Sequence, residues 1–428
     1  MAPSNPDSTE RETTRRQLLS SVGAASLVGL AGCSGDDSGN DPTETDAGAG
    51  DGGGTATETA DEPIPTATGT ERNGNGGNST DGETDQTWRS FRHNRRNTGH
   101  DPGLTGPDAS VRAAWSFAAD ALVRSPPTVD EQRVYVGSWD GNVYALDRTD
   151  GTEQWAVQFG GWVDAAPAVD DGTVYVGSHD GTIRALDAAD GAERWRVETS
   201  NRVLSSPAVL EDTVYVGSND GNVYALNRED GTQRWAVDTG AGVRSSPAVA
   251  DGTVYVGTND GTLYALDRED GSEEWTVSTD RRIQSSPAVA DGTVYVGSYD
   301  TYLHAVNDED GTEQWSFRTS GGVFSSPAVA DGAVFVGGND GTVYAIAVAD
   351  GSERWSFETG NEVKSSPAVA DGTVYVGSMD DLVYAIDAAD GSERWSFETG
   401  GSVECSPAVV NGTVYVGSRD TQIYALTE

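Results

Sequence analysis

Residues 243–279 read VRSSPAVADGTVYVGTNDGTLYALDREDGSEEWTVST, and their pattern predicts four short β-strands. The segments VRSSPAVA, TVYVGT, TLYALD and EEWTVST are rich in the β-branched and aromatic residues that favour strands. The segments between them contain three Asp-Gly pairs, Asp251-Gly252, Asp260-Gly261 and Asp270-Gly271. Because Asp-Gly readily adopts the positive φ angles of tight hairpins, we expect a four-stranded antiparallel meander.

The same unit recurs every 40 residues along the chain. One tryptophan marks each copy: Trp115, Trp155, Trp195, Trp235, Trp275, Trp315, Trp355 and Trp395. The prolines from Pro127 to Pro407 and the glycines from Gly137 to Gly417 keep the same spacing. Repeats of this length that consist of short strands indicate a β-propeller.

The repetitive part of the chain does not begin and end with a complete four-stranded unit. The repetitive part begins with a tryptophan-bearing strand and stops after the third strand of its last unit, residues 403–426. Residues 111–118 (VRAAWSFA) can supply the missing outer strand and cover an otherwise exposed edge. We therefore expect an all-β, monomeric, eight-bladed propeller of four-stranded antiparallel blades over residues 111–428, closed by the strand at 111–118.

These repeats resemble a known family. Ala145, Asp147, Gly151 and Trp155 match the A-x-D-x-x-x-G-x-x-x-W tryptophan-docking pattern of the pyrroloquinoline quinone (PQQ) repeat, and the later units repeat it. The chain is thus similar to PQQ-like propellers, a group that contains quinoprotein dehydrogenases and BamB-like assembly lipoproteins. The resemblance implies that the eight repeat tryptophans are structural and pack the outer strands between blades. Residues 88–110 resemble the lead-in of exported prokaryotic members, and their role stays open.

Residues 1–32 are typical of an export signal. Arg15 and Arg16 precede an apolar stretch that is too short to span a bilayer permanently, which matches a twin-arginine (Tat) signal. The sequence Leu-Ala-Gly before Cys33 resembles a lipobox, in which the cysteine becomes lipid-modified. We expect Tat export and an anchor at Cys33 on the outer face of the cytoplasmic membrane. The alternative, a buried N-terminal helix, is opposed by the polar flanks.

Residues 33–87 are predicted to be a disordered acidic tether. They contain 13 acidic residues and one basic residue, Arg72, with almost nothing apolar. Such a segment cannot bury enough surface to offset its ordering entropy. Asn78 and Asn411 stand in N-glycosylation acceptor patterns, and the sequence leaves open whether either is modified.

Composition excludes several classes of protein. The net charge of −42 is a poor match for nucleic acid, which requires a basic surface. The charge, together with a single lysine, resembles a protein of an extreme halophile, and a haloarchaeon is the expected source. The two cysteines, Cys33 and Cys405, exclude a disulfide framework and a cysteine-based zinc site. Cys405 occupies a column that other units fill with Ser or Ala, so we expect a small buried thiol.

The sequence assigns no catalytic, cofactor-binding or metal-binding residue. Quinoprotein dehydrogenases of this fold carry a catalytic Asp, calcium ligands, often a disulfide between adjacent cysteines, and long insertions. This chain has no adjacent cysteines and no insertion in its 40-residue period, so we expect neither PQQ nor calcium. Turn chemistry and halophilic acidity explain the aspartates at residues 267–271 better than a calcium loop does. The four histidines fall in different blades or in the lead-in, which argues against a histidine metal site.

One end of the propeller varies from blade to blade. The loops between the first and second strands, and between the third and fourth, are nearly uniform, whereas the loops at the opposite end differ. Because the scaffold does not dictate this variation, we predict a binding face there, unless the loops have simply drifted. Its residues are Arg124, Trp139, Trp162, His179, Arg202, Arg244, Arg281, Arg282, Tyr299, Phe324, Lys364, Met379 and Arg419. Arginine and aromatic residues are typical of interface cores.

These observations favour a non-catalytic, lipid-anchored scaffold at the cell surface. Its expected partners are other exported or membrane proteins, together with the membrane through Cys33. Two alternatives remain open at this point. One is a PQQ-dependent quinoprotein dehydrogenase or redox sensor, and the other is a polysaccharide-binding module.

Overall fold

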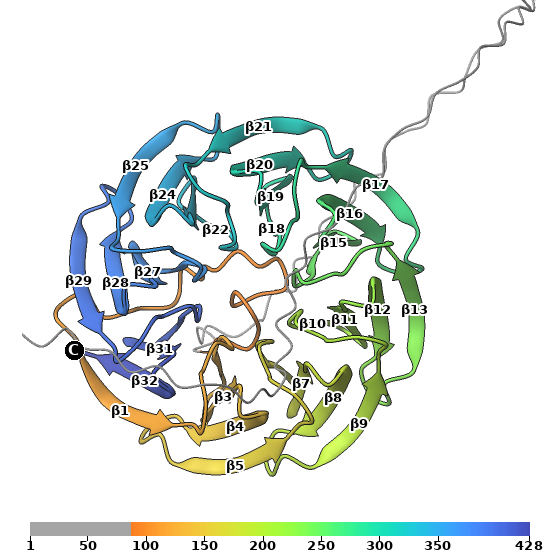
Figure 1. The fold of residues 1–428 in the computed structure, drawn as a ribbon, viewed down its shortest axis with the longest axis horizontal. Helices are drawn as coiled ribbons and strands as arrows, with labels where there is room; N and C mark the ends of the chain where they lie inside the picture. The colour runs from red at the N-terminus through yellow and green to blue at the C-terminus, as the bar shows by residue number, and fades with distance from the viewer. Residues whose placement is uncertain (1–86) are drawn as a thin grey trace, which may run out of the picture. The chain divides into compact units, whose positions relative to one another are not determined.

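The computed structural model describes residues 87–428. The predictions for Arg15 and Arg16, for the anchor at Cys33 and for the tether up to residue 86 lie outside the described residues. Within residues 87–428 the chain forms 32 β-strands in eight four-stranded sheets, arranged as a ring (Figure 1). This part of the chain contains no helix that is long and apolar enough to cross a membrane.

Each sheet is one blade, and in the first four blades the strands follow chain order within the sheet. Blade 1 consists of β2 (Thr128–Val129), β3 (Arg133–Gly137), β4 (Asn142–Asp147) and β5 (Glu153–Gln158). Blade 2 consists of β6 (Ala168–Asp170), β7 (Thr173–Gly177), β8 (Thr182–Asp187) and β9 (Glu193–Glu198). Blade 3 consists of β10 (Ala208–Leu210), β11 (Thr213–Gly217), β12 (Asn222–Asn227) and β13 (Gln233–Asp238). Blade 4 consists of β14 (Ala248–Ala250), β15 (Thr253–Gly257), β16 (Thr262–Asp267) and β17 (Glu273–Ser278).

Blades 5–7 have the same order. Blade 5 consists of β18 (Ala288–Ala290), β19 (Thr293–Gly297), β20 (Tyr302–Asn307) and β21 (Glu313–Arg318). Blade 6 consists of β22 (Ala328–Ala330), β23 (Ala333–Gly337), β24 (Thr342–Ala347) and β25 (Glu353–Glu358). Blade 7 consists of β26 (Ala368–Ala370), β27 (Thr373–Gly377), β28 (Leu382–Asp387) and β29 (Glu393–Glu398). Blade 8 consists of β30 (Ala408–Val410), β31 (Thr413–Gly417), β32 (Gln422–Thr427) and, from the other end, β1 (Arg112–Ala118).

Blade 8 joins the two ends of the propeller. β1 pairs antiparallel with β32, from Arg112 opposite Thr427 to Ala118 opposite Gln422. In Figure 1, β1 lies at the outer rim of this blade, as the tryptophan-bearing strands do in the other seven. The structure confirms the predicted eight-bladed all-β propeller and its closure by the strand at residues 111–118.

The innermost strands are shorter than the sequence predicts. In blade 4 the strand expected over residues 243–250 is only β14, Ala248–Ala250. The Ser246 amide donates a hydrogen bond to Ser286 Oγ in the next blade (2.8 Å) instead of to a neighbouring strand. Pro247 has no amide hydrogen to add to a strand ladder. The longer strand was therefore wrongly predicted, because side chains and a proline replace the ladder in this part of the repeat.

Side chains of neighbouring blades fill each blade interface. Between blades 4 and 5, Tyr255, Leu263 and Trp275 of blade 4 belong to one buried cluster with Val294 and Val296 of blade 5. Successive side chains of a strand point to opposite faces of its sheet, so each strand contributes to two interfaces. Both faces of a blade are therefore apolar, which explains the Val- and Tyr-rich strands.

The indole of a repeat tryptophan reaches the next blade. Trp275 Nε1 donates to the carbonyl of Asp308 (3.1 Å), and the ring lies against Gly311, which has a φ of +71° that favours glycine. A Cβ on Gly311 would approach the indole to 2.8 Å. Trp395 donates instead to the carbonyl of Pro107 (2.8 Å). The lead-in replaces a turn there, because blade 8 takes its outer strand from the start of the propeller.

The lead-in, residues 88–110, crosses the centre of the ring (Figure 1, orange). Its carbonyls accept 2.7–2.9 Å hydrogen bonds from blade amides: Val129 to Trp88, Val169 to Arg89, Val249 to Arg95, Val289 to Arg96, Val329 to Thr98, Val369 to Gly99 and Gly412 to Thr105. Within residues 87–428, blade 3 forms no backbone bond of this kind. One segment therefore fastens seven blades to one another through the channel.

Two lead-in side chains are buried inside the ring. Arg92 is 2% exposed and donates hydrogen bonds to the carbonyls of Pro327 (2.8 Å) and Pro367. Its Nε has no hydrogen-bond partner among the described residues, and burial lowers the pKa of Arg92 to about 9. Asn97, also 2% exposed, donates to the carbonyl of Pro247 (3.2 Å). The lead-in is thus held in the ring by buried polar contacts as well as by its backbone.

Cys405 takes the place of a serine in blade 8. Its Sγ accepts a hydrogen bond from the Gly417 amide (3.2 Å), as Ser245 Oγ does from the Gly257 amide in blade 4 (2.7 Å). Burial raises the pKa of the Cys405 thiol to about 12, so little thiolate forms at neutral pH.

We expect Cys405→Ser to change the free energy of unfolding by less than about 1 kcal/mol, because the serine can accept the same hydrogen bond. Thermal melting of the variant beside the unmodified protein measures this. A thiol reagent should label Cys405 only after unfolding. Rapid labelling of Cys405 in the folded protein would contradict the burial described here.

Candidate functional site

A funnel of about 320 Å³ opens on the face that carries the variable loops. Eight residues predicted for the binding face line it: Arg124, Trp139, Trp162, His179, Arg202, Arg244, Phe324 and Lys364. They come from loops that precede the inner strands and from loops between the second and third strands of the blades. The ring therefore gathers residues that are far apart in sequence around one cavity.

Five residues predicted for the same face do not line the funnel: Arg281, Arg282, Tyr299, Met379 and Arg419. Three of them contact its wall or one another. The guanidinium of Arg282 lies over the ring of Tyr299 at 4.0 Å, and Tyr299 meets Phe324 edge-on at 6.4 Å between ring centroids. Arg419 pairs with Glu404, which lines the funnel (3.4 Å). Arg281 is exposed, and Met379 is half-buried.

The funnel is also lined by residues that were not predicted from the sequence. Phe91 of the lead-in lines the cavity, and so does a belt of six serines: Ser206, Ser246, Ser286, Ser326, Ser366 and Ser406. Along this belt each serine Oγ accepts a hydrogen bond of 2.8–3.0 Å from the amide at the equivalent position of the preceding blade. The repeated Ser-Ser-Pro segment was the signal for the belt. No signal placed Phe91, because the lead-in is not part of the repeat.

An aromatic corner occupies one side of the funnel. The rings of Trp139 and Trp162 are stacked, with centroids 4.1 Å apart and planes within 1°. Trp162 is 45% exposed, whereas the other large apolar side chains of residues 87–428 are better covered. Beneath the stack, Asp164 accepts a hydrogen bond from Trp139 Nε1, and its carboxylate lies 2.8 Å from His179 Nε2. An exposed, rigid indole of this kind is a typical anchor for a protein partner.

The charges around Asp164 leave it ionised. Burial by itself would raise the pKa of Asp164, but the contact with His179, the positive charge of Arg124 and the hydrogen bond from Trp139 hold that pKa below its usual range. Arg124 also pairs with Glu404 at 2.6 Å, and the Glu404 side chain is only 7% exposed. Both carboxylates of the funnel wall are therefore already engaged by groups of the protein itself.

The cations of the binding face divide into two sets. Arg124 and Arg419 pair with Glu404, and Lys364 pairs with Glu362 at 2.7 Å. Four others have no carboxylate within 4 Å among residues 87–428: Arg202, Arg244, Arg281 and Arg282. This separation between paired and unpaired cations is not visible in the sequence.

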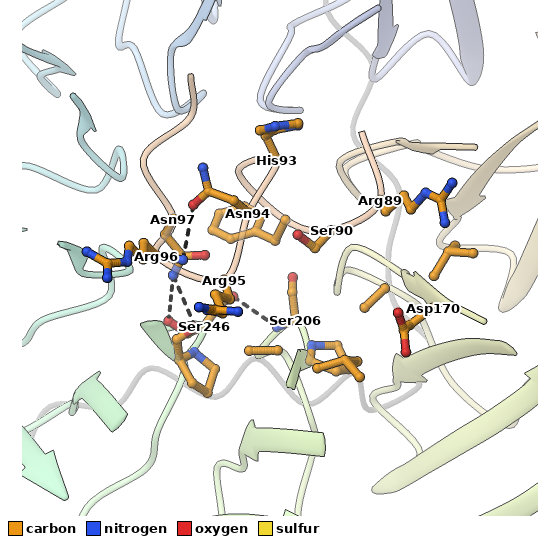
Figure 2. Close-up of a pocket in the computed structure, with 17 residues that line it drawn as sticks. Arg89, Ser90, His93, Asn94, Arg95, Arg96, Asn97, Asp170, Ser206 and Ser246 are labelled. Atoms are coloured by element: carbon orange, nitrogen blue, oxygen red, sulfur yellow. Dashed lines mark hydrogen bonds between the residues drawn. The ribbon is translucent and has the colours of Figure 1, made fainter. Parts of the chain in front are cut away.

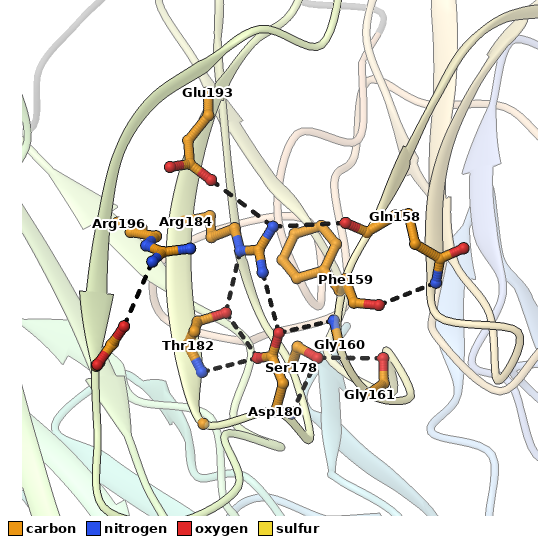
Figure 3. A network of polar contacts seen from close by, with 12 residues as sticks. Gln158, Phe159, Gly160, Gly161, Ser178, Asp180, Thr182, Arg184, Glu193 and Arg196 are labelled. Carbon is orange, nitrogen blue, oxygen red and sulfur yellow. Dashed lines mark hydrogen bonds and ion pairs between the residues drawn. The ribbon is translucent and has the colours of Figure 1, made fainter.

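The turn aspartates near the funnel mouth stabilise their own loops. In blade 2, Asp180 accepts hydrogen bonds from the amides of Gly160 (2.9 Å) and Thr182 (2.9 Å) and pairs with Arg184 (3.0 Å) (Figure 3). The Arg184 guanidinium lies 4.1 Å from the centre of the Phe159 ring. At residues 267–271, Asp267 and Asp270 accept hydrogen bonds from the amides of Glu269 (2.7 Å) and Ser272 (2.9 Å), which agrees with turn chemistry as the reason for these aspartates.

A second cavity of about 540 Å³ lies between the lead-in and the inner strands of blades 2–4. Figure 2 shows Asn94, Arg95 and Asn97 of the lead-in on one side and Ser206 and Ser246 on the other. The cavity lies where the lead-in makes no backbone bond to blade 3. Phe91, Ser206 and Ser246 line both this cavity and the funnel.

The residues of the funnel do not fit a quinone held by calcium. Calcium takes about six to eight oxygen ligands, and the lining carboxylates are Asp164 and Glu404, in blades 2 and 8. Cations and ring N–H groups already engage both of them. No group of three or more His, Cys, Asp or Glu side chains placed to hold a metal occurs within residues 87–428. Cys405 is buried as a free thiol and has no adjacent cysteine to form a cover over a quinone.

The repeats match the model of a known protein family. The family model described as outer membrane protein assembly factor BamB matches residues 104–161, 139–278, 259–366 and 339–428. A comparison with curated protein sequences finds no match.

Several solved structures share the fold. BamB from Moraxella catarrhalis is 23% identical with a TM-score of 0.65, and the match covers 74% of this chain and 100% of that one. A europium-containing methanol dehydrogenase is 14% identical with a TM-score of 0.70, covering 81% and 99% of the two chains. A quinohemoprotein alcohol dehydrogenase from Pseudomonas putida is 15% identical with a TM-score of 0.71, covering 80% of each chain. At these identities the likeness extends to the propeller alone.

Proposed function

Because this chain belongs to the family described as outer membrane protein assembly factor BamB, we propose that it is an exported, lipid-anchored propeller that holds other proteins at the cell surface without catalysis. The face of the propeller on which the funnel opens supports this proposal best. There an exposed tryptophan and several arginines surround a cavity at the end of the ring where the loops depart from the repeat. Buried aromatic and arginine side chains contribute most of the binding energy in many protein interfaces.

The position of the lead-in agrees with this role. Arg96 of the lead-in pairs with Asp251, which lies in the turn between the first and second strands of blade 4 (3.0 Å). That turn is at the end of the blade opposite to the variable loops. The lead-in is thus tied to the uniform end of blade 4, and Phe91 is the lead-in residue that lines the funnel at the other end.

Export and anchoring complete the proposal. The twin arginines Arg15 and Arg16, followed by Cys33 in a lipobox-like context, support Tat export and a lipid anchor on the outer face of the cytoplasmic membrane. We carry over from the family only the holding of other proteins. A net charge of −42 supports a haloarchaeal source, and such cells have no outer membrane to assemble.

We expect neutralisation of the face to weaken partner capture. In the variant Arg244→Gln, Arg282→Gln, Lys364→Gln, recovery of a protein that co-purifies in constant ratio with the unmodified chain should fall at least about tenfold, because loss of interface arginines costs several kcal/mol in many complexes. Thermal melting should stay within a few degrees of the unmodified protein. Quantitative co-purification from membranes of the native host measures the effect.

A matched variant provides the control. Arg196, Arg234 and Arg318 lie on the outer strands of blades 2, 3 and 5, away from the funnel, so their replacement by Gln removes the same charge elsewhere. Equal loss of capture in both variants, or no loss in either, would contradict the proposal. Stoichiometric quinone in the purified protein, or specific retention by a polysaccharide in place of a protein, would favour one of the alternatives.

A further inference from the structure

Three arginines of the predicted binding face, from three successive blades, have no carboxylate partner among the described residues. Arg202 lies in the loop that enters blade 3, Arg244 precedes the inner strand of blade 4, and Arg282 lies in the loop that enters blade 5. Within residues 87–428 none of the three has an acidic partner within 4 Å, whereas Arg124, Arg419 and Lys364 on the same face all do. Asp and Glu outnumber Lys and Arg by 69 to 27 in the chain, so a shortage of carboxylates cannot explain the difference.

Arg244 is the one of the three arginines that has a buried donor without a hydrogen-bond partner among the described residues. Its side chain is half-buried, and this donor is its Nε, which is fully covered. The pKa of Arg244 is lowered, first by burial and then by the positive charges of Arg282 and Arg202. Tyr299 and then Asp164 act on this pKa in the opposite direction, but His179 and Trp139 already engage the Asp164 carboxylate. A covered, unpaired donor beside two like charges costs free energy that a bound anion would offset.

The surroundings of the arginines indicate what kind of anion fits. Guanidinium groups bind carboxylates through paired, planar hydrogen bonds. Leu204, Phe324 and Phe91 line the funnel together with Arg244. A polypeptide can place acidic and apolar side chains next to each other on this surface. An acidic glycan presents hydroxyl groups, which match the serine belt but leave Leu204, Phe324 and Phe91 without a matching partner.

We propose that Arg202, Arg244 and Arg282 form a carboxylate-binding site that receives an acidic segment of the partner protein, with an apolar side chain of that segment entering the funnel. This inference rests on the proposed function and names the chemistry of the partner. Arg244 binds a carboxylate at the wall of the cavity. Arg202 and Arg282 take neighbouring carboxylates from the two adjoining loops, and the stacked Trp162 covers an adjoining part of the segment.

Peptide binding to the full-length protein tests the site. The probe is a fluorescein-labelled peptide in which glutamates flank a phenylalanine, measured by fluorescence anisotropy in the salt that keeps the protein folded. A matched peptide has glutamine in place of each glutamate, and an oligogalacturonate serves as the acidic glycan. We expect the glutamate peptide to bind at least about tenfold more tightly than either comparison ligand.

Variants identify the residues. Arg244→Gln should weaken binding of the glutamate peptide about tenfold or more and leave the melting temperature unchanged or raised, because it removes a covered charge. The affinity of Arg244→Lys for the glutamate peptide should lie between that of the unmodified protein and that of Arg244→Gln, because lysine keeps the charge but lacks the planar guanidinium group. Arg318→Gln, on the outer strand of blade 5 and outside the funnel, is the matched control and should bind like the unmodified protein.

Three results would overturn the inference: equal binding of the glutamate and glutamine peptides, preference for the oligogalacturonate, or equal effects of Arg244→Gln and Arg318→Gln. These results are separable from the proposed function. If one of these results is found, but the unmodified protein captures its native partner and the triple variant does not, the proposed scaffold function stands. Only the acidic character of the partner segment is then excluded. If the glutamate peptide binds as expected but no native protein is captured, the carboxylate site stands while the scaffold proposal fails.

Discussion

A chain that lacks residues 34–118 is expected to lose the cooperative unfolding of the ring, whereas a chain that lacks only residues 34–86 should keep it. The larger deletion removes β1, so the edge of β32 is left unpaired in blade 8. It also removes Trp115, whose Nε1 donates to the Arg148 carbonyl (3.1 Å), and Pro107, which receives Trp395. The contact that joins blade 8 to blade 1 and the contact that joins blade 7 to the lead-in are then both lost. The loss should exceed about 5 kcal/mol, which is comparable to the whole stability of many domains.

Thermal and denaturant unfolding followed by near-ultraviolet circular dichroism compare the two deletions. A third chain that lacks residues 34–110 keeps β1 and removes the lead-in. We expect it to fold with a lower melting temperature, because blade 8 is complete but the channel contacts are gone. Coincident unfolding curves for the 34–86 and 34–118 deletions would show that β1 does not close the ring.

Replacement of the buried lead-in arginine is expected to have the second largest effect. Arg92→Ala should lower the free energy of unfolding by about 3 kcal/mol or more, because it leaves the carbonyls of Pro327 and Pro367 without their donors and opens a hole in the channel. Arg95→Ala is the matched control. Arg95 is exposed, so its loss should change the free energy of unfolding by less than about 0.5 kcal/mol.

Arg92→Met separates the two causes of this loss. Methionine restores most of the volume without the donors, so its stability should lie between that of Arg92→Ala and that of the unmodified protein. Chemical denaturation of the full-length variants measures all three. If Arg92→Ala and Arg95→Ala unfold at the same denaturant concentration, the lead-in is not held by its buried guanidinium.

The 40-residue period was sufficient to predict the fold, because each blade is built from local hairpins. Asp-Gly at residues 251–252 and 270–271 predicts the turns, and the alternating Val and Tyr residues between them predict strands buried on both faces. The unpaired last unit predicted closure by residues 111–118, which the pairing of β1 with β32 confirms. The length of the inner strands was wrongly predicted, since the bonds of Ser246 run between blades and not along one strand.

The candidate site was predictable only in part. Departure from the repeat identified the face, and the ring brings eight of its predicted residues to one funnel. The repeat could not indicate Phe91, because the lead-in has no counterpart in the other units and its contacts extend from blade 1 to blade 8. It also could not indicate that Arg124 has a carboxylate partner while Arg244 has none.

The sequence by itself determined the number of blades, their strand order and the way in which the ends join, because these follow from short-range turns and from a count of repeats. Only the tertiary structure decided which loop residues surround the funnel, how the lead-in fills the channel and which arginines are left unpaired. Those properties depend on distances between side chains of different blades. Such distances are set by closure of the ring and are not encoded within any single 40-residue unit.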